Sequence, residues 1–340
     1  MNVNIRAPLG EFGSLPYCAR ILEPILRSNG FSVTVSKDYD PNSVNILIDE
    51  TISSVLNDRK AEIWWTDTPG MKPLSYHKLD EHLSKGLFVY HIVTSEFMKE
   101  HCNSLNIPVD DVIYRPINPI MFTVENIKTN HRYDLMTIGK FCICDRKRII
   151  LQRNLVMKHN YRYCAITDGW LPIRPHITKL DFGKVSDLTK ANLLSISKFF
   201  LWTSFVEGFG MPVLEAMAVG TPPIYSDCPA HNEFAEGIPI PTGDPVNGFC
   251  YGTKVIKFPL EESEVEKAVE YALNMTQEEY EDLSEKCREK AREVQNSTLN
   301  KIRKVLIPMI DRLSGETVND IAPSESNSGA RNETVTADAC

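Results

Sequence analysis

The chain has 340 residues, of which 42% are hydrophobic and 24% are charged, a composition typical of a folded protein with room for two domains. Its formal net charge of -8 argues against a general nucleic-acid binder, because such a protein needs a basic face that displaces counterions from phosphates. We therefore expect an ordinary globular protein with no nucleic-acid partner.

The first part of the chain alternates strand-like and helix-like segments. Apolar alternation at residues 3–7 predicts a strand, and the apolar spacing of residues 15–27 predicts a helix that ends before Gly30. Further strand-like runs follow at residues 31–35, 44–48, 62–66, 88–94 and 112–114. This alternation is typical of a parallel sheet covered by helices on both faces. We place the first domain at residues 1–125.

A polar stretch at residues 123–132 predicts a linker, and a second series of elements follows it in residues 126–313. The expected strands are residues 133–138, 161–167 and 199–205, and the expected helices are residues 146–159, 186–195, 261–274 and 277–313. The expected fold class is α/β, with two doubly wound Rossmann-like domains facing each other across a cleft. Residues 314–340 are polar with few large apolar side chains, which predicts a disordered tail.

The most informative segment is residues 199–226, FFLWTSFVEGFGMPVLEAMAVGTPPIYS. An apolar strand ends near Phe205, and Gly208 and Gly210 allow the following loop to bend tightly and to approach a ligand. Pro212 suits the first turn of a helix, where its missing N–H is not needed. The loop thus follows the carboxyl end of a parallel strand, where ligands of doubly wound sheets bind.

The start of the helix after this loop favours a phosphate, because its free N–H groups and dipole attract anions. Glu215 follows Pro212 by three residues, which predicts a place on the first turn, and its carboxylate suits the vicinal hydroxyls of a sugar. Glu207 precedes the loop on its other side. Each glutamate alone is explained by a solvated loop or a helix start, but their combination with the two glycines and the proline favours a ligand site.

The stretch EGFGMPVLEAMAVGTPPIYSD closely resembles the donor-binding signature of retaining glycosyltransferases of family 4, which have the two-domain GT-B fold. Weaker resemblance covers most of residues 1–310, including the segments PLGEFGS, VTSEFMKEHCNSLNIPVDDVIYRPINPIMF and TIGKFCICDRKRII. The resemblance implies a hexosyltransferase that uses a nucleotide-diphosphate sugar as donor. It also implies an acceptor-side first domain and a carbohydrate, lipid-linked or protein acceptor.

Carried over position by position, the resemblance implies that Glu207 holds the donor sugar and that Glu215 accepts from the ribose hydroxyls. Lys140 and Lys147 match the basic pair that neutralises the leaving diphosphate, whereas Arg146 and Arg148 are explained as a solvated helix face. The other donor-binding positions implied are Gly10, Gly13, Ser204, Gly208, Phe209, Gly210, Met211, Pro212 and Val213. Glu11 and Phe12 separate the two N-terminal glycines, which are adjacent in the family, so a plain turn stays an alternative there.

The sequence departs from the family at a first-domain histidine that many relatives place beside the transferred sugar. The matching segment, IWWTDTPGMKP at residues 63–73, contains no histidine, and Asp67 or Thr68 is its polar substitute. The adjacent Trp64 and Trp65 suit stacking on a sugar, but in a strand two adjacent aromatics are more often one core and one surface residue, which we expect here. His231 in the second domain is given no role.

The leading mechanism is charge stabilisation, in which Lys140, Lys147 and a helix N-terminus hold the departing nucleoside diphosphate. On this mechanism we expect no metal and no cofactor. One alternative keeps the fold but performs epimerisation or hydrolysis of the nucleotide sugar. The other is a catalytically silent module that binds nucleotide sugars.

The N-terminus has no charged start followed by a long apolar run, and no stretch reaches the roughly 18 apolar residues of a membrane span. The nine cysteines are scattered without the paired spacing of a zinc site, which favours thiols in a reducing compartment. We therefore expect a cytoplasmic protein. Peripheral membrane association is left open, although the sequence contains no strongly basic amphipathic helix.

Overall fold

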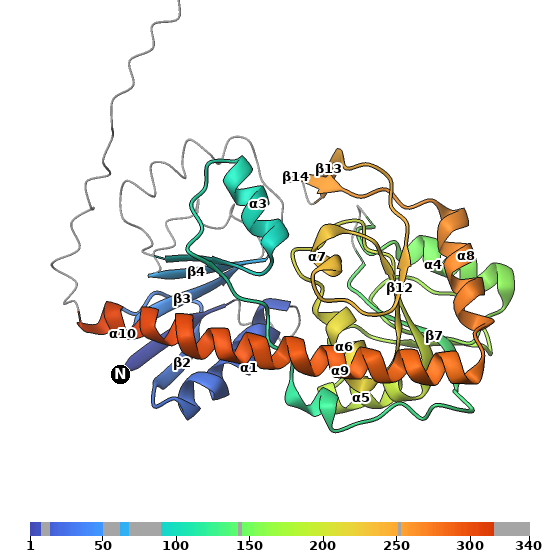
Figure 1. Ribbon diagram of the computed structural model, residues 1–340, viewed down its shortest axis with the longest axis horizontal. Helices are drawn as coiled ribbons and strands as arrows, with labels where there is room; N and C mark the ends of the chain where they lie inside the picture. Colours follow the sequence, from blue (N-terminus) through green and yellow to red (C-terminus); the bar gives the residue numbers. More distant parts are fainter. Residues whose placement is uncertain (8–13, 50–61, 68–89, 142–144, 251–252, 316–340) are drawn as a thin grey trace, which may run out of the picture.

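A computed structural model of the chain describes residues 1–7, 14–49, 62–67, 90–141, 145–250 and 253–315. It contains two six-stranded sheets, ordered β2-β1-β3-β4-β5-β6 and β12-β11-β10-β7-β8-β9, and a separate two-stranded sheet, β13-β14. Neighbouring strands within each six-stranded sheet run parallel, and helices pack beside both sheets (Figure 1). The predicted α/β fold with two doubly wound halves is confirmed.

The first sheet and its helices come from the N-terminal part of the chain. Their bounds are β1 (Asn2–Arg6), α1 (Ser14–Ser28), β2 (Ser32–Ser36), β3 (Val44–Asp49), β4 (Ile63–Thr66), β5 (Tyr90–Val93), α3 (Glu96–Ser104) and β6 (Asp111–Val112). Both Trp64 and Trp65 are buried, so the expectation of one surface tryptophan is wrong. The reason is that Trp64 packs with α3 residues on one face of the sheet while Trp65 packs with α1 residues on the other.

The second sheet follows a 3-10 turn, η2 (Pro119–Phe122). Its elements are β7 (Tyr133–Ile138), α4 (Ile149–His159), β8 (Tyr163–Ile166), β9 (Ile177–Leu180), α5 (Asp187–Ser195), β10 (Ser197–Trp202), α6 (Met211–Val219), β11 (Pro223–Ser226), α7 (Pro229–Asn232), β12 (Ile238–Ile240) and α8 (Glu262–Leu273). Between β12 and α8 lies the hairpin of β13 (Val246–Cys250) and β14 (Thr253–Lys257). Neither this hairpin nor the edge strand β9 is predicted by the sequence patterns.

Two predicted boundaries in the second half are wrong. The helix expected from residue 146 begins at Ile149, because Arg148 takes a left-handed conformation with φ 54° and Asp145 accepts a 2.8 Å hydrogen bond from the Ile149 amide. The strand expected to reach Phe205 ends at Trp202. The chain after Trp202 instead bonds to the turn before α4, through the Phe205 amide and the Arg146 carbonyl at 3.1 Å.

The linker segment is fixed to the second sheet by the buried amide of Asn126. Its Nδ2 donates to the Ser197 carbonyl at 3.0 Å and to Thr221 Oγ1 at 3.1 Å. Its Oδ1 accepts from the Tyr280 hydroxyl at 2.9 Å. Because these partners belong to the second half, any hinge in this connection lies before Asn126.

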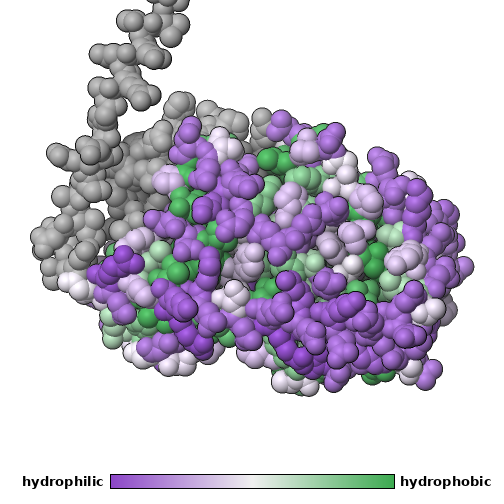
Figure 2. Space-filling view, viewed as in Figure 1, coloured by the Kyte–Doolittle hydropathy of each residue, from purple (hydrophilic) through white to green (hydrophobic). Residues whose placement is uncertain are grey.

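The C-terminal helices join the two halves. The chain runs through α9 (Gln277–Lys301), the π-helical segment η3 (Ile302–Leu306) and α10 (Ile307–Gly315), and Figure 1 shows this long element passing from the second sheet to the first. Gln295 on α9 forms two hydrogen bonds with the backbone of Ile117. Its Oε1 accepts from the Ile117 amide at 3.0 Å, and its Nε2 donates to the Ile117 carbonyl at 3.1 Å. The surface over α9 is mostly hydrophilic in Figure 2. Among the described residues, no helix combines the length and apolar character that a membrane crossing requires.

Candidate functional site

The candidate site is the loop between β10 and α6. Gly210 caps α6 in a left-handed conformation with φ 101°, and Pro212 lies within the first two positions of the helix. A Cβ atom on Gly210 would lie 2.6 Å from Nε2 of the buried His231, so both the conformation and the space require glycine there. The N-terminal turn of α6 therefore begins in the arrangement predicted from the glycines and the proline.

Lys147 and Glu207 form an ion pair under this loop. The side chains are only 11% and 8% exposed, and Lys147 Nζ donates to Glu207 Oε1. The ammonium also lies 4.0 Å from the centre of the Trp202 ring. Gly139 makes room for the lysine, because a Cβ there would lie 3.2 Å from Lys147 Cγ. Two of the predicted charged residues are thus brought together from segments 60 positions apart.

The environment of this pair moves both pKa values downward. Burial opposes ionisation of Glu207, but the positive charges of Lys147 and Arg146 outweigh it and hold the pKa of Glu207 at about 2. Burial, reinforced by Arg146, lowers the pKa of Lys147 to about 8 against the attraction of Glu207. At neutral pH both groups are therefore charged, and Lys147 is the one that titrates just above neutrality.

Glu215 lies on the second turn of α6 and not on its first, so that prediction is wrong. The helix starts at Met211, one residue before Pro212, and no acidic residue lies in its first turn. Glu215 is 2% exposed, and its Oε1 accepts from the Tyr17 hydroxyl and, at 2.6 Å, from Lys190 Nζ. Sequence reasoning missed both partners, since Tyr17 is 198 residues away and no local pattern marks either residue.

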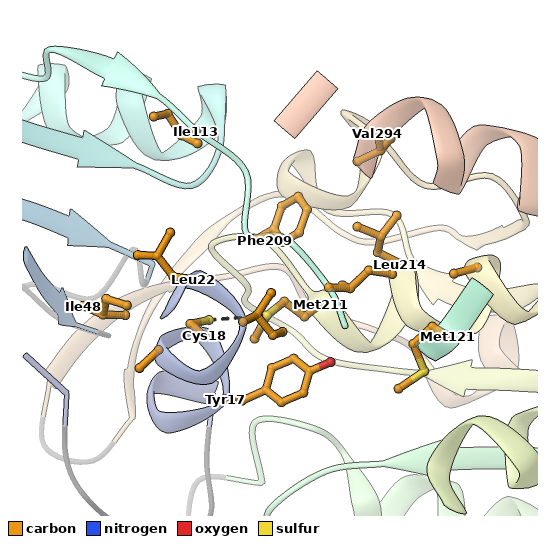
Figure 3. Packing of buried hydrophobic residues seen from close by; sticks show 14 of the residues in the cluster. Tyr17, Cys18, Leu22, Ile48, Ile113, Met121, Phe209, Met211, Leu214 and Val294 are labelled. Carbon is orange, nitrogen blue, oxygen red and sulfur yellow. Dashed lines mark hydrogen bonds between the residues drawn. The ribbon is translucent and has the colours of Figure 1, made fainter. Parts of the chain in front are cut away.

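The side chains of the loop residues after Gly208 point into the protein interior. Phe209 is fully buried between Tyr114 and Phe234, with ring centres 5.2 and 4.5 Å away. Figure 3 shows Met211 facing Cys18 of α1, and their sulfur atoms are 3.6 Å apart. The Val213 side chain is also buried. At these positions a ligand can be met only by the main chain, and the Val213 amide already donates to the Gly210 carbonyl at 3.0 Å.

Gly208 lies directly against the first domain. A Cβ atom on Gly208 would lie 1.3 Å from the Asp67 carbonyl oxygen, so no side chain fits there. The Gly208 carbonyl accepts from Ser95 Oγ at 2.6 Å and from Thr94 Oγ1 at 3.3 Å. Thr94 also donates to Asp67 Oδ1 at 3.0 Å. Asp67, predicted from the first domain, therefore reaches the loop predicted from the second.

The remaining predicted site residues are not brought into this cluster by any described contact. Lys140 is exposed after β7 and forms no ion pair with a described residue. Ser204 is buried and donates to the Val206 carbonyl at 3.1 Å, which shapes the loop. Gly10, Gly13 and Thr68 lie outside the described residues.

Within the part of the chain that the structure describes, one group of ionisable side chains has the spacing of metal ligands. His159, Glu266 and Glu270 place one ligand atom each within 4.8 Å of one another. Glu266 already accepts from Lys158 at 2.7 Å and bonds His159, which accounts for the cluster as surface ion pairing. It is carried by α4 and α8, away from the donor loop.

Residues 180–294 match the family described as Glycosyl transferases group 1, a range that includes α5, β10 and α6. The chain is also similar to two viral proteins. It is 28% identical to "Putative glycosyltransferase 48" of Sulfolobus islandicus filamentous virus, over 80% of this chain and 82% of that protein. It is 26% identical to "Putative glycosyltransferase ORF330" of Acidianus filamentous virus 2, over 68% and 75%.

Solved structures with the same fold share little sequence with this chain. Sucrose-phosphate synthase from Thermosynechococcus elongatus superposes with a TM-score of 0.65 at 12% identity, covering 92% of this chain and 100% of that one. TarM superposes with a TM-score of 0.56 at 14% identity, covering 86% of this chain and 57% of TarM. The fold is thus that of GT-B proteins, and with the group 1 domain it supports a glycosyltransferase.

The packing of His231 on Gly210 predicts the cost of a methyl group there. Gly210→Ala forces alanine to φ 101° and pushes Cβ into His231, whereas Gly30→Ala meets a similar φ of 91° with no atom within 4 Å. The conformation alone costs about 1–2 kcal/mol. We expect Gly210→Ala to lower the free energy of unfolding by at least about 1 kcal/mol more than Gly30→Ala, measured by urea denaturation. Equal losses would show that His231 does not restrict this position.

Proposed function

We propose that this protein transfers a hexose-type sugar from a nucleotide-diphosphate sugar to an acceptor hydroxyl, with retention of the anomeric configuration. The observation that carries the proposal is the buried Lys147–Glu207 pair beside the glycine-capped start of α6. A cation and a helix N-terminus suit a diphosphate, and an adjacent carboxylate suits sugar hydroxyls. The similarity to group 1 glycosyl transferases supports the same assignment.

In this reaction the bond between the anomeric carbon and the diphosphate oxygen breaks while the acceptor oxygen bonds to that carbon. Lys147 and the amides at the start of α6 stabilise the negative charge that builds up on the departing diphosphate. Lys140 adds a second cation when the phosphates are bound. Because the chain supplies these charges itself, we propose that no metal and no cofactor is required.

Glu207 orients the donor sugar by accepting hydrogen bonds from its hydroxyls, and Lys147 keeps this carboxylate ionised. Asp67 lies at the same loop through its contact with Gly208. We propose that Asp67 binds the transferring sugar or the incoming acceptor and is not an obligatory base. In a front-face retaining transfer the departing phosphate oxygen accepts the acceptor proton, so no base is needed on the opposite face.

Glu215 is proposed to bind the ribose hydroxyls of the donor. Its Oε1 accepts from Tyr17 and Lys190, so a ribose hydroxyl that binds this oxygen competes with the Tyr17 hydroxyl. Tyr17 belongs to α1 of the first half. The Tyr17 hydroxyl is thus the first-domain group that competes with the donor at Glu215.

The proposed acceptor is a carbohydrate, lipid-linked or protein hydroxyl, and the proposed place of action is the cytoplasm. The central experiment is a thermal-shift screen of nucleotide sugars, followed by acceptor profiling with the donor that stabilises most. A glycosylated acceptor supports the proposal. Free sugar or an epimerised donor without an acceptor product indicates the hydrolase or epimerase alternative, and binding without any turnover indicates a silent module.

Removal of the Glu215 carboxylate tests its role in holding the ribose. We expect Glu215→Ala to weaken nucleoside diphosphate binding by about 1–3 kcal/mol, the scale for hydrogen bonds to a charged acceptor. Tyr17→Phe removes only the competing hydroxyl and should bind the nucleotide more tightly. Calorimetry with the nucleotide alone measures both. Unchanged affinity in a folded Glu215→Ala protein would refute the ribose role.

The lowered pKa of Lys147 predicts an alkaline limb in the rate profile. Only the protonated amine stabilises the diphosphate, so kcat/KM should fall as the pH rises through about 8, the pKa of Lys147. Lys147→Arg is the control, because a guanidinium stays charged over this range. We expect this variant to be slower but to lose the alkaline limb. The same limb in both proteins would assign the titration to another group.

The stereochemistry of the product tests the retaining mechanism. We expect proton NMR of the first-formed product to show the anomeric configuration of the donor, and Asp67→Asn to reduce turnover without abolishing it. An inverting transfer would need a general base on the opposite face. An inverted product, with Asp67→Asn inactive but still binding the donor, would make Asp67 that base.

A further inference from the structure

Glu233, directly after α7, binds the N-terminus of a helix in the other half of the protein. Its Oε2 accepts from the Glu96 amide at 2.9 Å, and its Oε1 accepts from the Phe97 amide at 2.8 Å. Both amides lie in the first turn of α3. The same Oε2 also accepts from the Tyr114 hydroxyl at 3.1 Å. One half-buried carboxylate of the second domain thus receives three hydrogen bonds from the first.

This carboxylate completes the capping of α3. The first N–H groups of a helix have no partner within the helix, and they attract negative charge. Ser95 is the N-cap residue, and its Oγ accepts from the Met98 amide at 3.1 Å. Glu233 satisfies the Glu96 and Phe97 amides, which Ser95 does not reach. The start of α3 therefore depends on a residue more than a hundred positions away, in the second domain.

The capped turn of α3 also contacts the donor loop. The Ser95 hydroxyl that receives the Met98 amide donates to the Gly208 carbonyl at 2.6 Å. Tyr114, which donates to Glu233, stacks on Phe209 with ring centres 5.2 Å apart. A second aromatic contact, between Phe97 and Phe258 at 5.9 Å, lies beside them. Glu233 is thus linked to the residues on both sides of the Gly208–Phe209 peptide.

We propose that Glu233 is a positioning residue for sugar transfer, which clamps α3 to the second domain and so holds Ser95 on the Gly208 carbonyl. The inference rests on the proposed function for its effect on turnover, whereas the clamp itself is a property of the fold. Glu233 acts through Ser95 and the donor loop. The clamp sets the loop that carries Glu207 at a defined distance from Asp67 in the first domain.

Hydrogen exchange of the whole chain tests the clamp without any substrate. In Glu233→Gln the carboxylate charge and one strong acceptor are lost, so the Glu96 and Phe97 amides should exchange about tenfold faster or more, the scale for hydrogen bonds to a charged group. The matched control is Glu261→Gln, because Glu261 precedes α8 without a side-chain bond to that helix. Small-angle scattering of Glu233→Ala should show a larger radius of gyration than the wild type.

The rate of sugar transfer distinguishes a positioning role of Glu233 from a mere contribution to the stability of the fold. Glu233→Gln should lower kcat/KM for transfer about tenfold while leaving nucleoside diphosphate affinity unchanged, and the double variant with Ser95→Ala should be little worse than either single variant. Unchanged exchange at Glu96 and Phe97 in Glu233→Gln overturns the clamp. Faster exchange with unchanged kcat/KM overturns the positioning role. If the wild-type protein transfers no sugar, the proposed function is wrong, and hydrogen exchange at Glu96 and Phe97 still tests whether Glu233 clamps α3.

Discussion

The ion pair between Lys147 and Glu207 is the interaction around which the site is arranged. Burying two charges carries a large desolvation cost, and a buried pair adds little to stability compared with apolar packing. This pair packs against Trp202 on one side, and on another side a Cβ atom at Gly139 would lie 3.2 Å from Lys147 Cγ. A lysine ammonium and an ionised carboxylate near the start of a helix suit the binding of a charged ligand, whereas they add little to the stability of the core.

The first domain makes polar contacts with the donor loop, with α6 and with the end of α7. Tyr17 bonds Glu215, Ser95 and Thr94 bond the Gly208 carbonyl, and the amides of α3 bond Glu233. Polar contacts of this kind are exchanged for ligand or water contacts at small net cost, because each partner keeps a hydrogen bond. Any movement between the halves must also break the apolar contacts of Phe209 with Tyr114 and of Met211 with Cys18.

The connections between the halves restrict where such a movement is located. Asn126 ties the linker to β10, to α9 and to the turn after α6, so residues beyond it move with the second sheet. Gln295 on α9 holds the Ile117 backbone just before η2. The residues between these two anchors are also held to the second half, since Asn118 donates to Asp187 of α5 at 2.9 Å and Arg288 of α9 donates to the Phe122 carbonyl at 3.1 Å. Any bend in this connection therefore lies before Ile117.

Local patterns in the sequence determined the two parallel sheets and the start of α6, because apolar periodicity, Gly210 and Pro212 act on the backbone near them. The family resemblance predicted Glu207 and Lys147 as site residues, but it did not predict that the two would pair. Local patterns did not predict the hairpin β13–β14 or the position of Glu215 on the second turn of α6, because short polar strands and exact helix starts leave weak local signals. Only the tertiary structure decided that Tyr17 meets Glu215, since contacts between distant residues depend on how the two halves pack.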